Sequence, residues 1–149
     1  MANLLMAGLA LGIIAAPPLA GQFEHRVRID HASGPVDAHY RSTVKVATKQ
    51  VGTAAGPGKM STLACTWRAD VTIEREARNA SGSVMRRSIE RDGVIEGRRA
   101  GWCSTHRDAI DAEIARHDDK LRGHLVEVAR DDHSVLNGEL DGLPRSNSG

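Results

Sequence analysis

The strongest constraint on this fold is a change in hydrophobic period at Gly101-Trp102-Cys103. Before that point apolar side chains alternate with polar ones, and after it they recur at spacings of three, four and seven residues. Alternation places the apolar residues on one face of a strand, whereas the longer spacings place them along one stripe of a helix. The chain is therefore expected to build a sheet first and a helix afterwards.

Four segments alternate in this way, and turn-forming residues separate them. Ser33-Gly34-Pro35 favours a turn, the Gly- and Pro-rich run 52–58 a flexible loop, and Asn79-Ala-Ser-Gly82 a hairpin. Such short connections predict an antiparallel meander. The predicted strands span residues 23–30, 36–46, 62–74 and 83–89.

The third and fourth of these strands differ in the quality of their pattern. Residues 62–74 alternate most clearly, which places Cys65 and Trp67 together on the buried face. Arginines interrupt the pattern of residues 83–89, and Asp92-Gly93 favours a tight turn soon afterwards. The fourth segment is therefore expected to be a frayed or bulged edge strand.

The C-terminal part is expected to form an amphipathic helix. Ser104 or Thr105 is predicted to cap its start, Asp131-Asp132-His133-Ser134 to interrupt it, and a short second helix to run over residues 134–140. A sheet and a helix with one apolar side each bury those sides by stacking. The expected fold class is α+β, a four-stranded antiparallel β-meander with a long C-terminal amphipathic helix packed across one face. The apolar stripe comprises Ile110, Ile114, Leu121, Leu125 and Val128.

The N-terminal residues have the properties of a secretory signal peptide. The apolar run 4–16 is too short for the ~20 residues that cross a bilayer, and Pro17-Pro18 ends it. Cleavage after Ala20 or Gly21 is expected, which gives a signal peptide over residues 1–21. Gln22 stands where a lipoprotein would have its cysteine, so no lipid anchor and no transmembrane segment are expected after cleavage.

The rest of the chain suits one domain with one cross-link. Residues 22–141 are expected to form a single α+β domain, and residues 142–149 a disordered tail. Cys65 and Cys103 are the two cysteines of a chain addressed to an oxidising compartment, so a disulfide between them is predicted.

Charge argues against nucleic acid as a partner, because the formal net charge is only +1. The distribution is uneven: residues 22–103 hold 14 Lys/Arg against 9 Asp/Glu, and residues 104–141 hold 5 against 10. The two parts are expected to attract each other. A candidate basic patch, suited to an acidic lipid or polymer unless the acidic helix neutralises it, comprises Arg86, Arg87, Arg91, Arg98 and Arg99.

The sequence predicts no catalytic residues, metal site or cofactor. His117 and His124 share a helix face but lie about 10 Å apart, which is too far to share one ion. No Gly-x-Ser-x-Gly elbow, Gly-x-Gly-x-x-Gly loop or Walker loop occurs. The helix carboxylates are interspersed with basic residues, as on an ordinary solvated face.

Several segments resemble small exported proteins of alphaproteobacteria that have no known activity: residues 23–31, 33–36, 65–67, 92–97 and 101–103. The resemblance implies a periplasmic or secreted location and a disulfide. Three functions stay open. The first is a non-catalytic envelope accessory or interaction protein. The second is a carrier of a small apolar or amphipathic ligand between sheet and helix, and the third is an enzyme or metal-binding protein using a histidine such as His106 or His133.

Overall fold

The computed structural model describes residues 21–143 of the 149-residue chain. The predicted signal peptide, apart from Gly21, and residues 144–149 of the predicted tail lie outside the described residues. The elements, in chain order, are β1 (Gln22–His31), β2 (Gly34–Val51), β3 (Ala64–Asn79), β4 (Val84–Ala100), the 3-10 turn η1 (Cys103–Thr105), α1 (Arg107–Ala115) and α2 (Asp118–Asp141).

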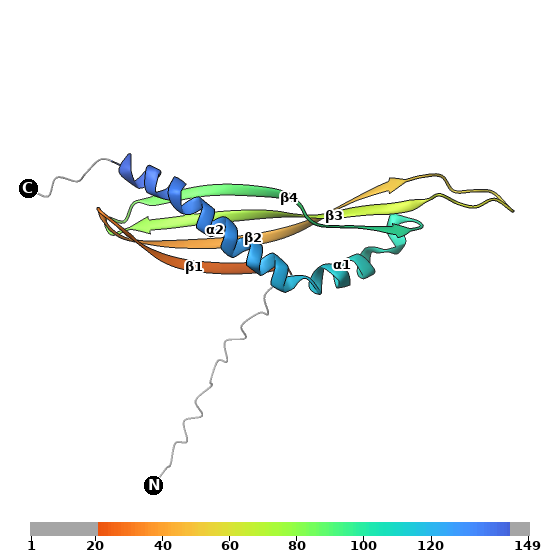
Figure 1. The fold of residues 1–149 in the computed structure, drawn as a ribbon, viewed down its shortest axis with the longest axis horizontal. Helices are drawn as coiled ribbons and strands as arrows, with labels where there is room; N and C mark the ends of the chain where they lie inside the picture. The colour runs from red at the N-terminus through yellow and green to blue at the C-terminus, as the bar shows by residue number, and fades with distance from the viewer. Residues whose placement is uncertain (1–20, 144–149) are drawn as a thin grey trace, which may run out of the picture.

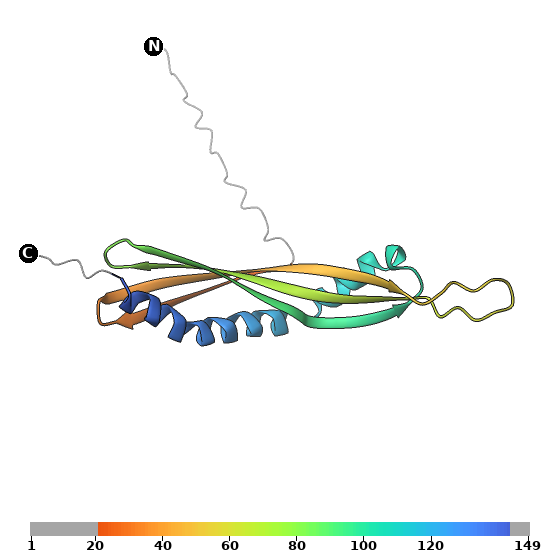
Figure 2. The same ribbon diagram turned by 90° about the horizontal axis from the view of Figure 1, so that it is seen from above.

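The four strands form one antiparallel sheet in the order β1-β2-β3-β4, and α2 runs diagonally across one of its faces (Figure 1). The view from above shows the sheet twisting strongly along its length, with α2 on one side only (Figure 2). The predicted fold class, an antiparallel meander with a long C-terminal helix packed across one face, is confirmed.

The strands are longer than predicted and unequal in length. β1 has 10 residues, whereas β2 has 18 and continues well past the end of β1. β4 has 17 residues and continues beyond Ile89, through the expected turn at Asp92-Gly93. β4 has the predicted bulge at this point. It has extra residues opposite the step from Ala69 to Val71 of β3, and the pairing register shifts there.

The helical region breaks at a different place from the one predicted. The interruption lies at Arg116-His117, and α2 continues without a break through residues 131–134. The predicted interruption at residues 131–134 was wrong, because the carboxylate of Asp132 is buried against the sheet and paired with Arg75 and Arg87 from within the helix. Neither Ser104 nor Thr105 forms a capping hydrogen bond for α1, since both lie within η1.

Strand register divides the side chains between two faces of the sheet. The helix-bearing face holds the odd-numbered residues of β1 and β3 and the even-numbered residues of β2, including Tyr40 and Ile73. The open face holds the alternate residues, which are mostly charged. This division follows from the period-two alternation of the sequence, as predicted.

The two halves of the sheet differ in whether α2 packs against them. We call the covered half the part beneath α2: β1, β2 to Thr43, β3 from Val71 and β4 to Arg91. We call the distal half the rest, with η1 and α1. Buried apolar residues of both halves join one core, and those that α2 contributes to it are Leu121, Leu125, Val128, Ala129, Leu136 and Leu140.

Candidate binding surface at the distal half of the sheet

The first part of β2 lies beside β1 and beneath α2, whereas the second part, residues 45–50, does not. β1 ends its pairing at Gln22, opposite Thr43, and one more backbone bond joins the Val44 N–H to the Gly21 carbonyl at 3.2 Å. Residues 45–50 still pair with β3, yet their side chains are exposed on both faces of the sheet. Val46, at 41% exposure, is one of the four large apolar side chains that the described structure leaves exposed.

A groove of about 310 Å³ runs beside this part of β2, on the helix-bearing face. Val46 and Thr48 form its wall on the strand side, and the buried Ile110 of α1 adds apolar surface opposite. Arg107 and Asp111 lie on the same side as Ile110 and are exposed. The groove therefore has an apolar floor and a charged rim, as ligand-binding grooves commonly do. Its remaining lining residues are Cys103 and Ser104.

A larger hollow of about 530 Å³ lies on the open face of the same half. Its side chains come from two rows of the register, Lys49 with Thr66 and Ala47 with Arg68 and Glu96. The row between them, Thr48–Trp67–Gly97, directs its side chains to the other face and so provides the floor.

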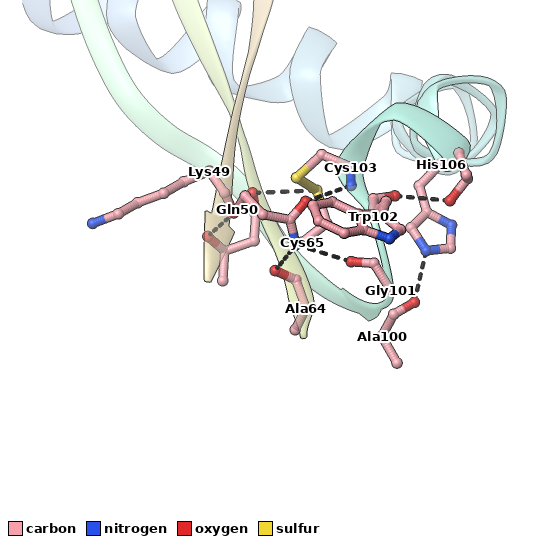
Figure 3. The surroundings of a disulfide bond; sticks show 11 residues. Lys49, Gln50, Ala64, Cys65, Ala100, Gly101, Trp102, Cys103 and His106 are labelled. Atoms are coloured by element: carbon pink, nitrogen blue, oxygen red, sulfur yellow. Dashed lines mark hydrogen bonds between the residues drawn. A yellow bond between two sulfur atoms is a disulfide. The ribbon is translucent and has the colours of Figure 1, made fainter. Parts of the chain in front are cut away.

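The disulfide fixes the connection between the sheet and the helices (Figure 3). Cys65 of β3 is bonded to Cys103 of η1, as predicted. Beside it, the amide of Gln50 donates to the carbonyls of Ala64 (2.8 Å) and Gly101 (3.1 Å). Its side-chain oxygen accepts a bond from the Cys103 N–H at 2.8 Å. These contacts hold three segments together and position α1 next to β2. No pattern in the sequence indicated this role of Gln50.

The covered half contains a buried ionic network that alternation did not predict. The Arg75 guanidinium is fully buried beneath α2 and donates to Asp132 at 2.8 Å and to Glu139. Arg87 donates to the other Asp132 oxygen at 3.1 Å, and the Tyr40 hydroxyl donates to Asp132 at 3.1 Å. Burial, and then the Asp132 carboxylate, raise the pKa of Tyr40 well above its ordinary value of 10.0. The network fills space between sheet and helix with polar contacts.

The five arginines of the candidate basic patch do not share one face. Register places Arg87, Arg91 and Arg99 on the helix-bearing face, and the other two on the open face. Arg87 and Arg99 are paired with Asp132 and Glu113 of the helices. The expected attraction between the basic sheet and the acidic helices thus occurs at these pairs. Arg86 and Arg98 are the two on the open face.

Ion pairs cover much of the open face in the covered half. Glu24 contacts His39 and Arg41, and Glu76 contacts Arg78 and Arg86. Hydrogen bonds from Arg78 and Arg86 lower the pKa of the Glu76 carboxyl below its ordinary value. In the distal half Arg68 pairs with Asp70 at 3.2 Å, whereas Lys45, Lys49 and Arg98 form no ion pair with any described residue.

Of the two histidines named as candidate acid–base groups, only His106 forms a side-chain hydrogen bond within residues 21–143. The His106 ring lies 2.7 Å from the Ala100 carbonyl, and His133 is exposed on α2. His31 lies between Ser33 (2.8 Å) and Asp141 (3.1 Å), but its Nδ1 also accepts the Ser33 backbone N–H, as in an ordinary turn. Within residues 21–143 no three His, Cys, Asp or Glu side chains converge as metal ligands would.

Comparisons with protein families, curated proteins and solved structures yielded no match to this chain. No helix formed by residues 21–143 is long and apolar enough to cross a membrane. The resemblance to exported alphaproteobacterial proteins stays a prediction, and the functional argument depends on the geometry of the chain itself.

Proposed function

We propose that this protein is an exported, periplasmic or secreted, non-catalytic interaction module that binds a partner through the distal half of its sheet. One observation carries the proposal: residues 45–50 of β2 remain hydrogen-bonded to β3 while their side chains are exposed on both faces. The outer side of this stretch has no neighbouring strand within residues 21–143, and unpaired backbone groups at a sheet edge are a template for pairing with another chain.

The rigidity of the distal half supports this function. The disulfide and the three bonds of Gln50 hold β2, β3 and η1 in fixed positions. A surface that is already ordered loses less conformational entropy when a partner binds. The two hollows described above lie on opposite faces of this half, so a partner has concave surface on either side of β2.

Carriage of a small ligand between sheet and helix has less support. The space beneath α2 is occupied by Leu125, Leu136 and Ile73, which are fully buried, and by the Arg75–Asp132 pair. The hollows of about 530 and 310 Å³ lie outside this interior. The apolar contacts that would hold an apolar ligand there are instead made between the helix and the sheet.

Site-specific photocross-linking in the native host tests the interaction function. A benzophenone side chain is placed at Met60 or Ala47, which are exposed in the distal half, and at Val135 of α2 as a matched exposed apolar control. We expect one discrete adduct from the distal positions and none from Val135. Absence of an adduct at the distal positions, or equal adducts at all three, would contradict the proposal.

Export is tested separately by intact mass. The mature protein is expected to begin at Gly21 or Gln22 and to be two hydrogens lighter than its reduced form, because Cys65 and Cys103 are bonded. A full-length chain that starts at Met1 would contradict signal-peptide cleavage. It would not affect the interaction function, which the cross-linking experiment tests separately.

A further inference from the structure

We propose that the outer edge of β2, from Lys45 to Val51, binds an extended acidic peptide of a partner protein as an added strand. The inference rests on the proposed interaction function and deepens it by naming the chemistry of the partner. Three features of the edge support this partner: its outward backbone groups, the groove on one face and the unpaired cations on the other.

The backbone of this edge continues the ladder that β1 begins. In an antiparallel strand, alternate residues direct both the N–H and the C=O to the same side. Val44 donates toward β1, so Val46, Thr48 and Gln50 direct their backbone groups outward in the same way. Consistent with this alternation, the Lys49 carbonyl points toward β3 and accepts the Thr66 hydroxyl at 3.1 Å. No strand within residues 21–143 pairs with the edge from Lys45 to Val51.

The groove beside the edge would receive one set of side chains from an added strand. Residues opposite Val46 and Thr48 would project onto the helix-bearing face, where the groove of about 310 Å³ lies. The apolar surface of Val46 and Ile110 favours small apolar side chains at these positions. Arg107 and Asp111 at its rim lie within the reach of polar groups of the same strand.

The charges on the open face determine which side chains of an added strand fit opposite Lys45, Ala47 and Lys49. Residues opposite Lys45, Ala47 and Lys49 would occupy non-hydrogen-bonded pairs, in which facing side chains approach most closely. Lys45 and Lys49 are exposed cations without an ion-pair partner among the described residues. Opposite charges in such pairs are favourable and like charges are unfavourable. The fitting peptide therefore has acidic residues at alternate positions, with small apolar residues between them.

The test uses the oxidised mature protein and a fluorescein-labelled peptide of alternating Glu and Val residues. A peptide with Lys in place of Glu is the control. Fluorescence anisotropy is expected to show binding of the Glu peptide and little binding of the Lys peptide. The amide hydrogens of Val46, Thr48 and Gln50 are expected to exchange more slowly when the Glu peptide is bound.

Two variants locate the binding to this edge. Val46→Pro removes an outward N–H and places a ring where the peptide backbone would lie, so affinity is expected to fall about tenfold or more. The matched control is Ala100→Pro at the outer edge of β4, an exposed and uncharged position where alternation also directs the N–H outward; affinity is expected to stay unchanged. The exchange of Lys45 and Lys49 for Glu, which leaves the backbone intact, is expected to reverse the preference between the two peptides.

Three results would overturn the inference. Binding that survives Val46→Pro in a folded protein would exclude this edge, and equal binding of both peptides would exclude the acidic preference. A concentration-dependent dimer that Val46→Pro abolishes, with no peptide binding, would assign the edge to a second copy of the chain. Cross-linking from Met60 and Ala47 judges the proposed function independently, because it detects a partner anywhere on the distal half.

Discussion

The covered and distal halves of one sheet are stabilised in different ways. In the covered half, α2 lies over an ionic network around Arg75 and Asp132 and over apolar residues of all four strands. In the distal half, a disulfide and the side chain of Gln50 secure the strands to η1, and residues 45–50 of β2 stay exposed. Both halves share one apolar core, but the distal half has specific cross-links where the covered half has α2.

The difference between the two halves bears on the proposed binding by the distal half. A surface can be exposed and still ordered only if something other than burial fixes its backbone. The Cys65–Cys103 bond does this at the end of β3, and Gln50 does it at the end of β2. The comparison is open to test by substitutions in each half.

The largest effect is expected from the covered half, in Asp132→Ala. The substitution leaves the buried Arg75 with only Glu139 and removes the acceptor of the Tyr40 hydroxyl. Breaking a buried pair by removing one partner costs about 3–5 kcal/mol of unfolding free energy. Urea unfolding monitored by circular dichroism measures the loss.

The control for Asp132 is an exposed carboxylate of the distal half. Asp111→Ala removes a charge from the rim of the groove and is expected to change stability by less than about 0.5 kcal/mol. Equal losses for the two variants would show that the halves do not differ as described.

The disulfide gives the second largest effect and divides the halves most sharply. Replacing Cys65 and Cys103 by Ser removes a closure of 38 residues, for which the chain-entropy model gives roughly 3 to 4 kcal/mol. We also expect faster amide exchange in η1, α1 and the end of β2, with protection retained beneath α2. Uniform loss of protection along the whole sheet would contradict the independence of the distal half.

The sequence predicted the architecture because hydrophobic period reports which face of an element is buried. The alternation around Trp67 and the stripe of Ile110, Ile114 and Leu121 were enough to place four strands and a covering helix. The disulfide was predicted from the presence of two cysteines in a chain with a predicted secretory signal. These inferences depend on local patterns alone.

The proposed binding surface could not be predicted from the sequence, because it arises from unequal strand lengths. Alternation of apolar and polar residues weakens after Val46. The sequence pattern therefore did not predict that β2 continues to Val51, beyond its pairing with β1. Asp132 looked like part of a helix break, since a charged residue gains burial only through partners that lie far away in sequence. Gln50 likewise acts through three backbone groups that only the fold brings near.

A pair of glycine substitutions tests the packing of the two halves. A Cβ at Gly97 would lie 2.5 Å from the indole ring of Trp67, so Gly97→Ala is expected to cost about 1–3 kcal/mol. A Cβ at Gly123 of α2 meets nothing within 4 Å, so Gly123→Ala is expected to stabilise by about 0.5–1 kcal/mol. Thermal unfolding of both variants checks the signs, and a neutral Gly97→Ala would mean that the distal half tolerates repacking.

The smallest effect concerns Tyr40, the one tyrosine of the chain. Tyr40→Phe removes a hydrogen bond to Asp132, which costs about 1 kcal/mol near neutral pH. Because the folded-state pKa of Tyr40 lies above its ordinary value of 10.0, the neutral hydroxyl stabilises the fold fully below that pH. This contribution is lost as the pH rises above about 10 toward the folded pKa, since the unfolded chain then releases the proton more readily.

Urea unfolding at a series of alkaline pH values separates this effect from the titration of other groups. The wild-type protein is expected to lose stability more steeply than Tyr40→Phe above about pH 10, and the two curves are expected to run parallel below it. The phenolate absorbance of the folded wild type should appear only at higher pH than that of the unfolded chain. Parallel curves over the whole range would mean that the Tyr40 hydroxyl is solvated in both states, and that the covered half is less tightly closed than its contacts with Asp132 indicate.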